Sequence, residues 1–179
     1  LLSKIGTSDA IDIFKNINQI IDDFDINKFG KSKPKFDKVE LLNLNSKFFQ
    51  LTNFDDISNQ LNTLDFEITT EFWNLIKGNI NTFNDIKFWW DIVYGKIKTI
   101  NDDHEFTHLA LKTLPNDSFD KNTWSTWTSL LMKESGRKGK DLFKPLRLCL
   151  TGQNNGPEMA NLVLTMGRQK IVERLNNKN

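Results

Sequence analysis

The amino-acid sequence predicts an all-α fold for this chain of 179 residues. Apolar residues recur at the spacing of helix turns along most of the chain, and a residue suited to cap a helix stands before each run. Glycines follow many of the runs, as they do where helices end. No stretch reads convincingly as a strand, so we expect a bundle of short amphipathic helices.

Each predicted helix begins after a polar side chain that can accept a hydrogen bond from the first turn. In chain order, these caps and runs are Asp37 before 39–48, Thr52 or Asn53 before 54–61, Thr69 or Thr70 before 72–77, Asn81 or Thr82 before 83–93, Asp102 or Asp103 before 106–111, and Thr123 before 124–131. The glycines expected to end helices are Gly78, Gly95, Gly136, Gly152 and Gly167.

The segment 143–168 predicts a helix, a break and a second helix. Pro145 suits only the first turn of a helix, and Gly152 suits the left-handed position after a helix end. Pro157 suits the first turn of the next helix, where Glu158 is favourable beside the positive end of the helix dipole. The break therefore directs a helix N-terminus toward whatever lies beyond the loop.

The composition fits a globular protein, because hydrophobic residues make up 38% of the chain and charged residues 26%. The sequence contains no long apolar run and no charged-then-apolar leader, so we expect no membrane-spanning helix and no signal peptide. The missing initiator Met suggests a fragment or a processed chain. The single cysteine, Cys149, stands between leucines and is interpreted as a core thiol in a reducing compartment, so we expect a cytoplasmic protein.

The net charge of +1 hides an asymmetry along the chain. Residues 1–132 carry 14 lysines against 19 acidic residues, whereas residues 133–179 carry 10 basic residues against 4 acidic ones. The arginines all lie in the second part, and the planar guanidinium suits phosphates and base edges better than an ammonium does. This placement indicates an RNA-facing end, with a solvated helix face as the alternative. The arginines are Arg137, Arg147, Arg168 and Arg174.

The segment from Pro145 to Gly152 reads Pro-Leu-Arg-Leu-Cys-Leu-Thr-Gly, and Gly156-Pro-Glu and Met166-Gly-Arg follow it. This order closely resembles the C-terminal signature of bacterial glutamyl-tRNA synthetases. The resemblance extends back through 136–143 and 124–127 to 36–45 and 5–9, and so covers nearly the whole chain. It implies a helical cage, with residues 1–52 as the tail of a connecting region, 53–101 as a first anticodon-binding subdomain and 102–179 as a second.

The resemblance implies that the full-length protein joins glutamate to its tRNA using ATP and Mg²⁺. The catalytic motifs of the family, a His-Ile-Gly-His-like sequence and a Lys-Met-Ser-Lys-Ser-like loop, are absent from this chain. Phosphate-binding glycine loops and a nucleophile elbow are absent as well. We therefore expect the tRNA-binding part of the enzyme, a monomer that binds no cofactor and does not activate glutamate.

The resemblance also assigns residues to the anticodon. Arg147 falls on the signature arginine that approaches the bases, although a salt bridge to Glu158 would also account for it. Met159 falls on an apolar position that lies against the bases, or is an ordinary core residue. Further phosphate contacts are predicted for lysines and an arginine nearby in the sequence, while the tryptophans are expected mostly in the core. The basic residues are Lys133, Arg137, Lys138, Lys140 and Lys144.

One further position concerns the choice of tRNA. In some relatives an arginine at the end of a helix discriminates the third anticodon base and so excludes glutamine tRNA. Asn79 aligns with it here, and Lys77 is the nearest basic side chain, which lacks the guanidinium fork. We therefore hypothesise relaxed discrimination, with tRNA(Gln) accepted beside tRNA(Glu).

Two readings from other classes of protein stay open. The run from His104 through Glu105 to His108 matches the His-Glu-x-x-His pattern of zinc hydrolases, but the sequence holds no other histidine to serve as a third ligand. A freestanding helical interaction module would explain the same core. Neither reading explains the pattern at 143–168.

Overall fold

The computed structural model describes residues 1–14, 16–100 and 102–176. Within these ranges every regular element is helical and no strand occurs, which confirms the all-α prediction. In chain order the elements are α1 (Ile17–Asp23), the short 3-10 helix η1 (Ile26–Lys28), α2 (Lys38–Leu51), α3 (Phe54–Leu61), α4 (Thr70–Ile76), α5 (Asp85–Val93), α6 (His104–Thr113), α7 (Thr123–Ser135), α8 (Lys140–Thr151) and α9 (Met159–Asn176).

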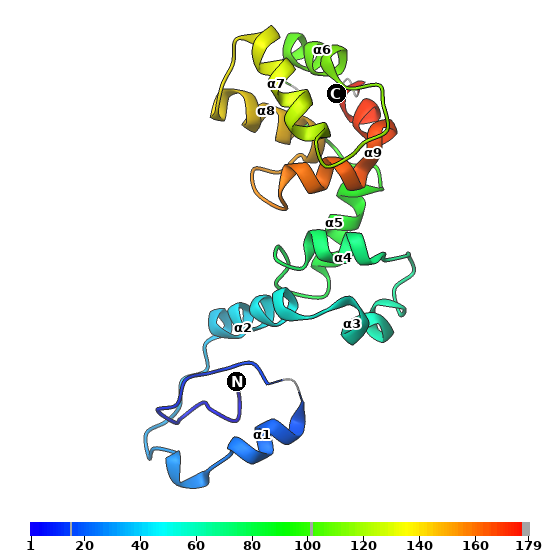
Figure 1. Cartoon of the computed structure of the whole chain (residues 1–179). Helices are drawn as coiled ribbons and strands as arrows, with labels where there is room; N and C mark the ends of the chain where they lie inside the picture. The colour runs from blue at the N-terminus through cyan, green and yellow to red at the C-terminus, as the bar shows by residue number, and fades with distance from the viewer. Residues whose placement is uncertain (15, 101, 177–179) are drawn as a thin grey trace.

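The molecule is elongated, with the N-terminal segment at one end and α6 to α9 at the other (Figure 1). Helix α9 is broken at Gly167, with φ 71° and ψ 165°, where the sequence predicted a helix end. It is central to the larger end, because it packs against α4, α5, α6, α7 and α8. It therefore joins the middle of the molecule to the C-terminal bundle. The predicted boundaries after residues 52 and 101 stay predictions.

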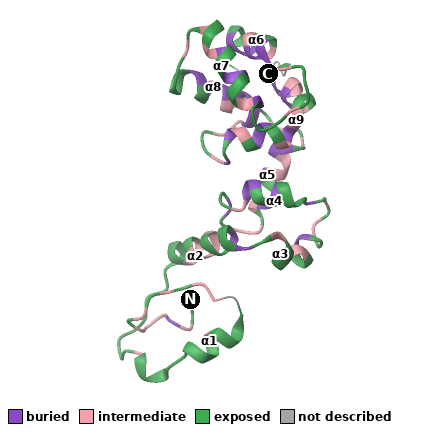
Figure 2. Ribbon diagram, in the orientation of Figure 1, coloured by how far each residue is buried: buried purple, intermediate pink, exposed green. Residues whose placement is uncertain are grey.

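The core begins late in the chain (Figure 2). Among the described residues before Phe49 the buried one is Lys4, whose ammonium pairs with the carboxylates of Asp9 and Asp23. The N-terminal segment is further closed by a backbone hydrogen bond of 2.9 Å from Gly30 to the carbonyl of Gly6. Ion pairs and turns, rather than apolar packing, hold this end of the molecule.

Several helix starts lie where the sequence placed them. The side chains of Asp37, Thr69 and Asp103 accept hydrogen bonds from the backbone at Val39, Phe72 and Phe106, at 2.7, 3.2 and 3.0 Å. These bonds satisfy donors that have no partner within the helix.

Helices α5 and α7 begin differently from the prediction. Helix α5 starts at Asp85, because the Asp85 carboxylate accepts hydrogen bonds from the amides of Asn81 and Thr82 and holds these residues in a turn. In α7, Thr123 is the first helical residue rather than the cap, and its hydroxyl accepts from the amide of Asp120 at 2.8 Å.

The two prolines of the segment 143–168 do not lie in the first turns of their helices, where the sequence predicted them. Pro145 lies inside α8, a full turn beyond the start at Lys140, where it lacks the N–H that would bond to the Asp141 carbonyl. Pro157 precedes α9, because the first helical bond joins the Leu162 amide to the Glu158 carbonyl at 3.0 Å. Gly152 ends α8 in the left-handed conformation, with φ 67°, as predicted.

The core residues agree with the expectation for most tryptophans. Trp73, Trp89 and Trp127 are buried, while Trp90 and Trp124 are half-buried against the core. Cys149 is also buried, and burial raises the pKa of its thiol to about 11, which makes it an unreactive core thiol.

Candidate nucleic-acid interface

An open hollow of about 380 Å³ lies against one face of α8. The side chains of Lys140, Lys144 and Arg147 border it, because residues three and four apart share a helix face. Phe143 and two asparagines of the loop between α8 and α9, Asn154 and Asn155, complete the lining. We call this site, defined by these residues, the α8 hollow. It gathers positive charge, one aromatic ring and two amides, which are the groups that RNA loops contact.

Arg147 is fixed by the loop that follows α8. Its Nη2 donates a hydrogen bond of 2.9 Å to the carbonyl of Pro157, while its Nη1 is buried without a hydrogen-bond partner in the protein. Burial lowers the pKa of the guanidinium, because desolvation disfavours the charged form. The salt bridge to Glu158 considered as an alternative does not form, since the Glu158 carboxylate accepts from Asn161 at 2.9 Å instead.

The loop between α8 and α9 is shaped by close contacts at its glycines. A Cβ at Gly152 would lie 2.9 Å from the carbonyl oxygen of Lys98, and one at Gly156 would lie 2.1 Å from the ring of Trp89. Both distances exclude a side chain, and both glycines have positive φ. The Thr151 hydroxyl adds a hydrogen bond of 3.0 Å from the Gln153 amide. The loop is therefore held against α5 and the segment before α6.

Two other C-terminal residues predicted to contact RNA, Met159 and Arg137, are less available. Met159 is 7% exposed and belongs to the core at the start of α9. Arg137 pairs with Asp103 at 2.6 Å and lies 4.7 Å from the centre of the Phe106 ring, so it ties the end of α7 to the start of α6. Neither residue lines the α8 hollow.

Lys77 and Asn79 lie in the turn after α4, away from the α8 hollow. The Lys77 ammonium is 3.4 Å from the carbonyl of Thr52. The Asn79 side chain is exposed, and its carbonyl accepts a hydrogen bond of 3.2 Å from the indole of Trp89. The structure therefore connects this turn to the α8–α9 loop through one tryptophan.

A family model described as an anticodon binding domain matches residues 40–178. The chain belongs to the anticodon binding domain family. It is 41% identical over 176 residues to glutamate–tRNA ligase 1 of Ehrlichia chaffeensis, covering 97% of this chain and 39% of that protein. It is 36% identical over 175 residues to glutamate–tRNA ligase 1 of Maricaulis maris, covering 98% and 39%. The chain thus spans about two fifths of the length of these relatives.

The fold of this anticodon binding domain is also found in solved structures. A glutamate tRNA ligase of Elizabethkingia meningosepticum, in complex with its amino acid, matches 89% of this chain and 35% of its own length with a TM-score of 0.72 at 18% identity. A glutamate-tRNA synthetase of Elizabethkingia anophelis matches the same shares with a TM-score of 0.71 at 19% identity. The likeness of folds and the relatives together confirm the resemblance to glutamyl-tRNA synthetases.

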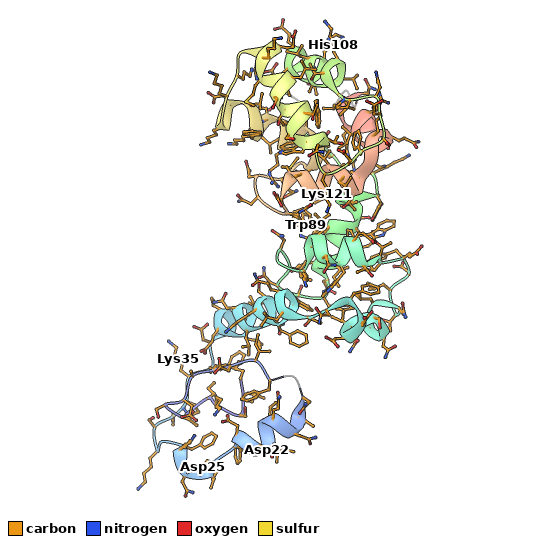
Figure 3. The ribbon with its side chains drawn as sticks, in the orientation of Figure 1. Asp22, Asp25, Lys35, Trp89, His108 and Lys121 are labelled. Carbon is orange, nitrogen blue, oxygen red and sulfur yellow. The ribbon has the colours of Figure 1, made fainter. Side chains whose placement is uncertain are left out.

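The zinc pattern of the sequence is not supported by the structure of this domain. His104 and His108 are exposed on α6, with His108 at the surface of the C-terminal bundle (Figure 3). No group of three or more histidine, cysteine, aspartate or glutamate side chains in the described ranges is placed to hold a metal ion.

The described helices are all too short or too polar to cross a membrane.

Sequence reasoning misread one arginine of the basic end. Arg174 is fully buried, and its Nη2 donates to the carbonyls of Ile92 and Gly95 at 3.0 and 2.9 Å, where α5 ends. It is therefore a structural residue of this domain rather than an RNA contact. The signal was its place between Ile171 and Leu175, which mark the apolar face of α9.

Proposed function

We propose that this anticodon binding domain holds the anticodon loop of a tRNA against the α8 hollow. The observation that carries the proposal is the gathering of Lys140, Lys144 and Arg147 around one open hollow in a chain of this family. Three positive charges at an open surface attract a phosphate backbone. The guanidinium adds a planar fork that fits the edge of a base, which an ammonium does not offer.

The residues of the hollow divide the work by their chemistry. Lys140 and Lys144 contact phosphates, because an ammonium is a point charge on a flexible stem. Arg147 and the amides of Asn154 and Asn155 donate to base edges. Phe143 is 38% exposed and offers a ring face on which an unstacked base can lie.

In the full-length protein, the proposed activity is that of a glutamate–tRNA ligase. The supporting observation is the names of the relatives, which this chain matches over two fifths of their length. Such an enzyme joins glutamate to tRNA(Glu) with ATP and Mg²⁺, here as a cytoplasmic monomer. The proposal includes relaxed discrimination against tRNA(Gln), because Asn79 leaves the turn after α4 without a guanidinium.

Binding of the chain to tRNA tests the proposed site directly. The dissociation constant is measured for tRNA(Glu) and for a version with a changed anticodon, at low and moderate salt, with the original chain and with Arg147→Ala. We expect the original chain to prefer the original anticodon and Arg147→Ala to lose roughly tenfold of that preference, the size of one good base contact.

The matched control for that experiment is Arg168→Ala. Arg168 is an exposed arginine of α9 that bonds to Pro115 and Asn116, away from the α8 hollow. It carries the same charge, so a general electrostatic effect would weaken binding in both variants alike. Binding that ignores the anticodon, or that both variants weaken equally, would contradict the proposed site.

The accepted tRNAs are tested on the full-length ligase. Aminoacylation with glutamate is compared between tRNA(Glu) and tRNA(Gln), for the original enzyme and for Asn79→Arg. The proposal predicts glutamate attached to both tRNAs by the original enzyme and a selective loss of tRNA(Gln) in the variant. Strong rejection of tRNA(Gln) by the original enzyme would refute relaxed discrimination, but it would not bear on the proposed anticodon site at the α8 hollow.

A further inference from the structure

Trp89 is the side chain that contacts both surfaces proposed to meet RNA. Its indole Nε1 donates a hydrogen bond of 3.2 Å to the carbonyl of Asn79, in the turn after α4. Its six-membered ring lies against Gly156, in the loop that borders the α8 hollow. The residue is 5% exposed, and it lies where the middle of the molecule meets the start of α9 (Figure 3).

The contact with Gly156 is too close for any other residue. A Cβ at that position would come within 2.1 Å of Cη2 and 2.9 Å of Cζ2 of Trp89, distances at which the ring or the loop must move. The next residue, Pro157, offers its carbonyl to Arg147 at 2.9 Å. A displacement of the Trp89 ring is therefore passed through two neighbouring residues to the guanidinium of the α8 hollow.

The hydrogen bond from the Trp89 indole to Asn79 fixes the distance between α5 and the turn after α4. The Asn79 amide donates to Ile76 at 2.7 Å and its carbonyl accepts from Trp89, so both of its backbone groups are used. The turn after α4 is thereby attached to α5 by a rigid, planar side chain. An indole spans the gap with few rotatable bonds, so the two surfaces keep one spacing.

We infer that Trp89 is a positioning residue for RNA recognition, which sets the distance between the turn that carries Asn79 and the loop that carries Asn154 to Pro157. This inference rests on the proposed function of the two surfaces. Trp89 itself does not contact the RNA. It holds the two surfaces at one spacing, so that a single anticodon loop can contact both of them at once.

The test compares Trp89→Phe with Trp127→Phe in the 179-residue chain. Trp127 is a matched control because it is fully buried and its indole donates a hydrogen bond of 2.9 Å to the Ala110 carbonyl, in α6 rather than in either surface. Both substitutions remove one indole hydrogen bond and part of a buried ring. Dissociation constants are measured for an anticodon stem-loop and for versions changed at the first anticodon base, the third base, or both.

We expect Trp89→Phe to reduce the preference for the original anticodon about tenfold, within the range found for coupled contacts, and Trp127→Phe to leave that preference unchanged. In the original chain, changing both bases should cost less binding free energy than the sum of the two single changes. The reason is that the rigid link lets one mismatch disturb both surfaces. In Trp89→Phe, the losses of binding free energy from the two base changes should simply add. A loss of stability alone would leave them non-additive, as in the original chain.

A second measurement does not depend on how well the variants fold. In the original chain, the nuclear magnetic resonance signals of the Trp89 and Trp127 indoles are followed as the stem-loop is added. The Trp89 signal should shift with the original anticodon more than with a changed one, while the Trp127 signal stays in place. An unmoved Trp89 signal, or equal shifts at both tryptophans, would overturn the inference.

The outcomes separate the inference from the proposed function. If the original chain prefers the original anticodon and Trp89→Phe retains the whole preference and the non-additivity, the inference fails and the proposed function stands. If the original chain shows no anticodon preference, the proposed function fails, and the inference fails with it.

Discussion

The face of α8 around Arg147 and the junction of α5 with α9 around Arg174 place the same side chain in opposite surroundings. Arg147 borders an open hollow and gives one hydrogen bond to the protein, to the Pro157 carbonyl. Arg174 is fully buried, and its Nη2 bonds to the carbonyls of Ile92 and Gly95. Burial lowers the pKa of both guanidiniums, because both lose water that favours the charged form.

The difference lies in what surrounds each arginine. The last carbonyls of α5 have no partners within the helix and carry its negative dipole end, so a buried cation there is stabilised. The α8 hollow offers Arg147 other cations, Lys140 and Lys144, and no carboxylate. A cation among cations at an open surface is suited to an anion from outside the protein. The surroundings of each arginine therefore separate a structural role from a binding role.

The largest expected effect comes from removing the buried arginine. Arg174→Ala would remove the donor of the Ile92 carbonyl, leave the Gly95 carbonyl to the Lys170 ammonium at 3.2 Å, and open a cavity between α5 and α9. We expect the free energy of unfolding to fall by about 3 to 5 kcal/mol. The melting temperature, followed by circular dichroism, should fall by roughly 10 °C.

The control for this prediction lies on the same helix. Arg168→Ala removes an exposed arginine of α9 and should change the free energy of unfolding by less than about 0.5 kcal/mol. Equal melting temperatures for the two variants would show that the junction of α5 with α9 does not depend on Arg174.

A smaller effect, on binding rather than on stability, is expected at the open site. Arg147→Lys keeps the charge but loses the planar fork, so attraction to phosphates stays while the fit to a base edge is lost. The preference for the original anticodon should fall about tenfold, with the salt dependence of binding unchanged. A steeper or shallower salt dependence with the preference intact would instead make Arg147 a phosphate contact.

Much of this comparison depends on features that the sequence could only partly reveal. The caps at Asp37, Thr69 and Asp103 are local, since a side chain bonds to the backbone of its own first turn, and they were predicted correctly. The grouping of Lys140, Lys144 and Arg147 also follows from helix periodicity alone.

The remaining features depend on contacts between distant segments. Arg174 is buried because the end of α5, about eighty residues earlier, lies beside it. Trp89 is interpretable as a core tryptophan from the sequence, but its contact with Gly156 exists only once α9 has packed on α5. Pro145 lies deeper in its helix than expected, because Lys140 rather than the proline begins α8. Spacing along the chain carries no information about such pairs.

Substituting a lysine of the α8 hollow should affect tRNA binding less than Arg147→Lys does. Lys144→Ala removes one phosphate contact, so the slope of log binding constant against log salt should fall by about 0.7, whichever anticodon is used. Lys133→Ala is the matched control, because Lys133 is exposed on α7 and does not line the hollow. The affinity and slope are measured by titration at several salt concentrations. An equal change in both variants would mean that the basic end acts as a whole rather than through the hollow.

The smallest effect concerns a third arginine, Arg137, which pairs with Asp103 on the surface. The Phe106 amide, and then the Arg137 guanidinium, lower the pKa of the Asp103 carboxyl below its ordinary value. Since the pKa is depressed in the folded state, this stabilisation is present at neutral pH and is lost as the pH falls through the folded-state value. The pair is solvent-screened, so it is worth less than about 1 kcal/mol.

Asp103→Asn isolates that charge, because the amide oxygen can still cap α6. The variant should melt roughly 2 °C below the original chain at pH 7, and this difference should narrow as the pH falls through the lowered pKa of the Asp103 carboxyl. Asp102→Asn, at the exposed residue before the cap, controls for the change in net charge. A difference that does not narrow as the pH falls would assign the loss to cap geometry, and the ion pair of Arg137 would then contribute nothing measurable.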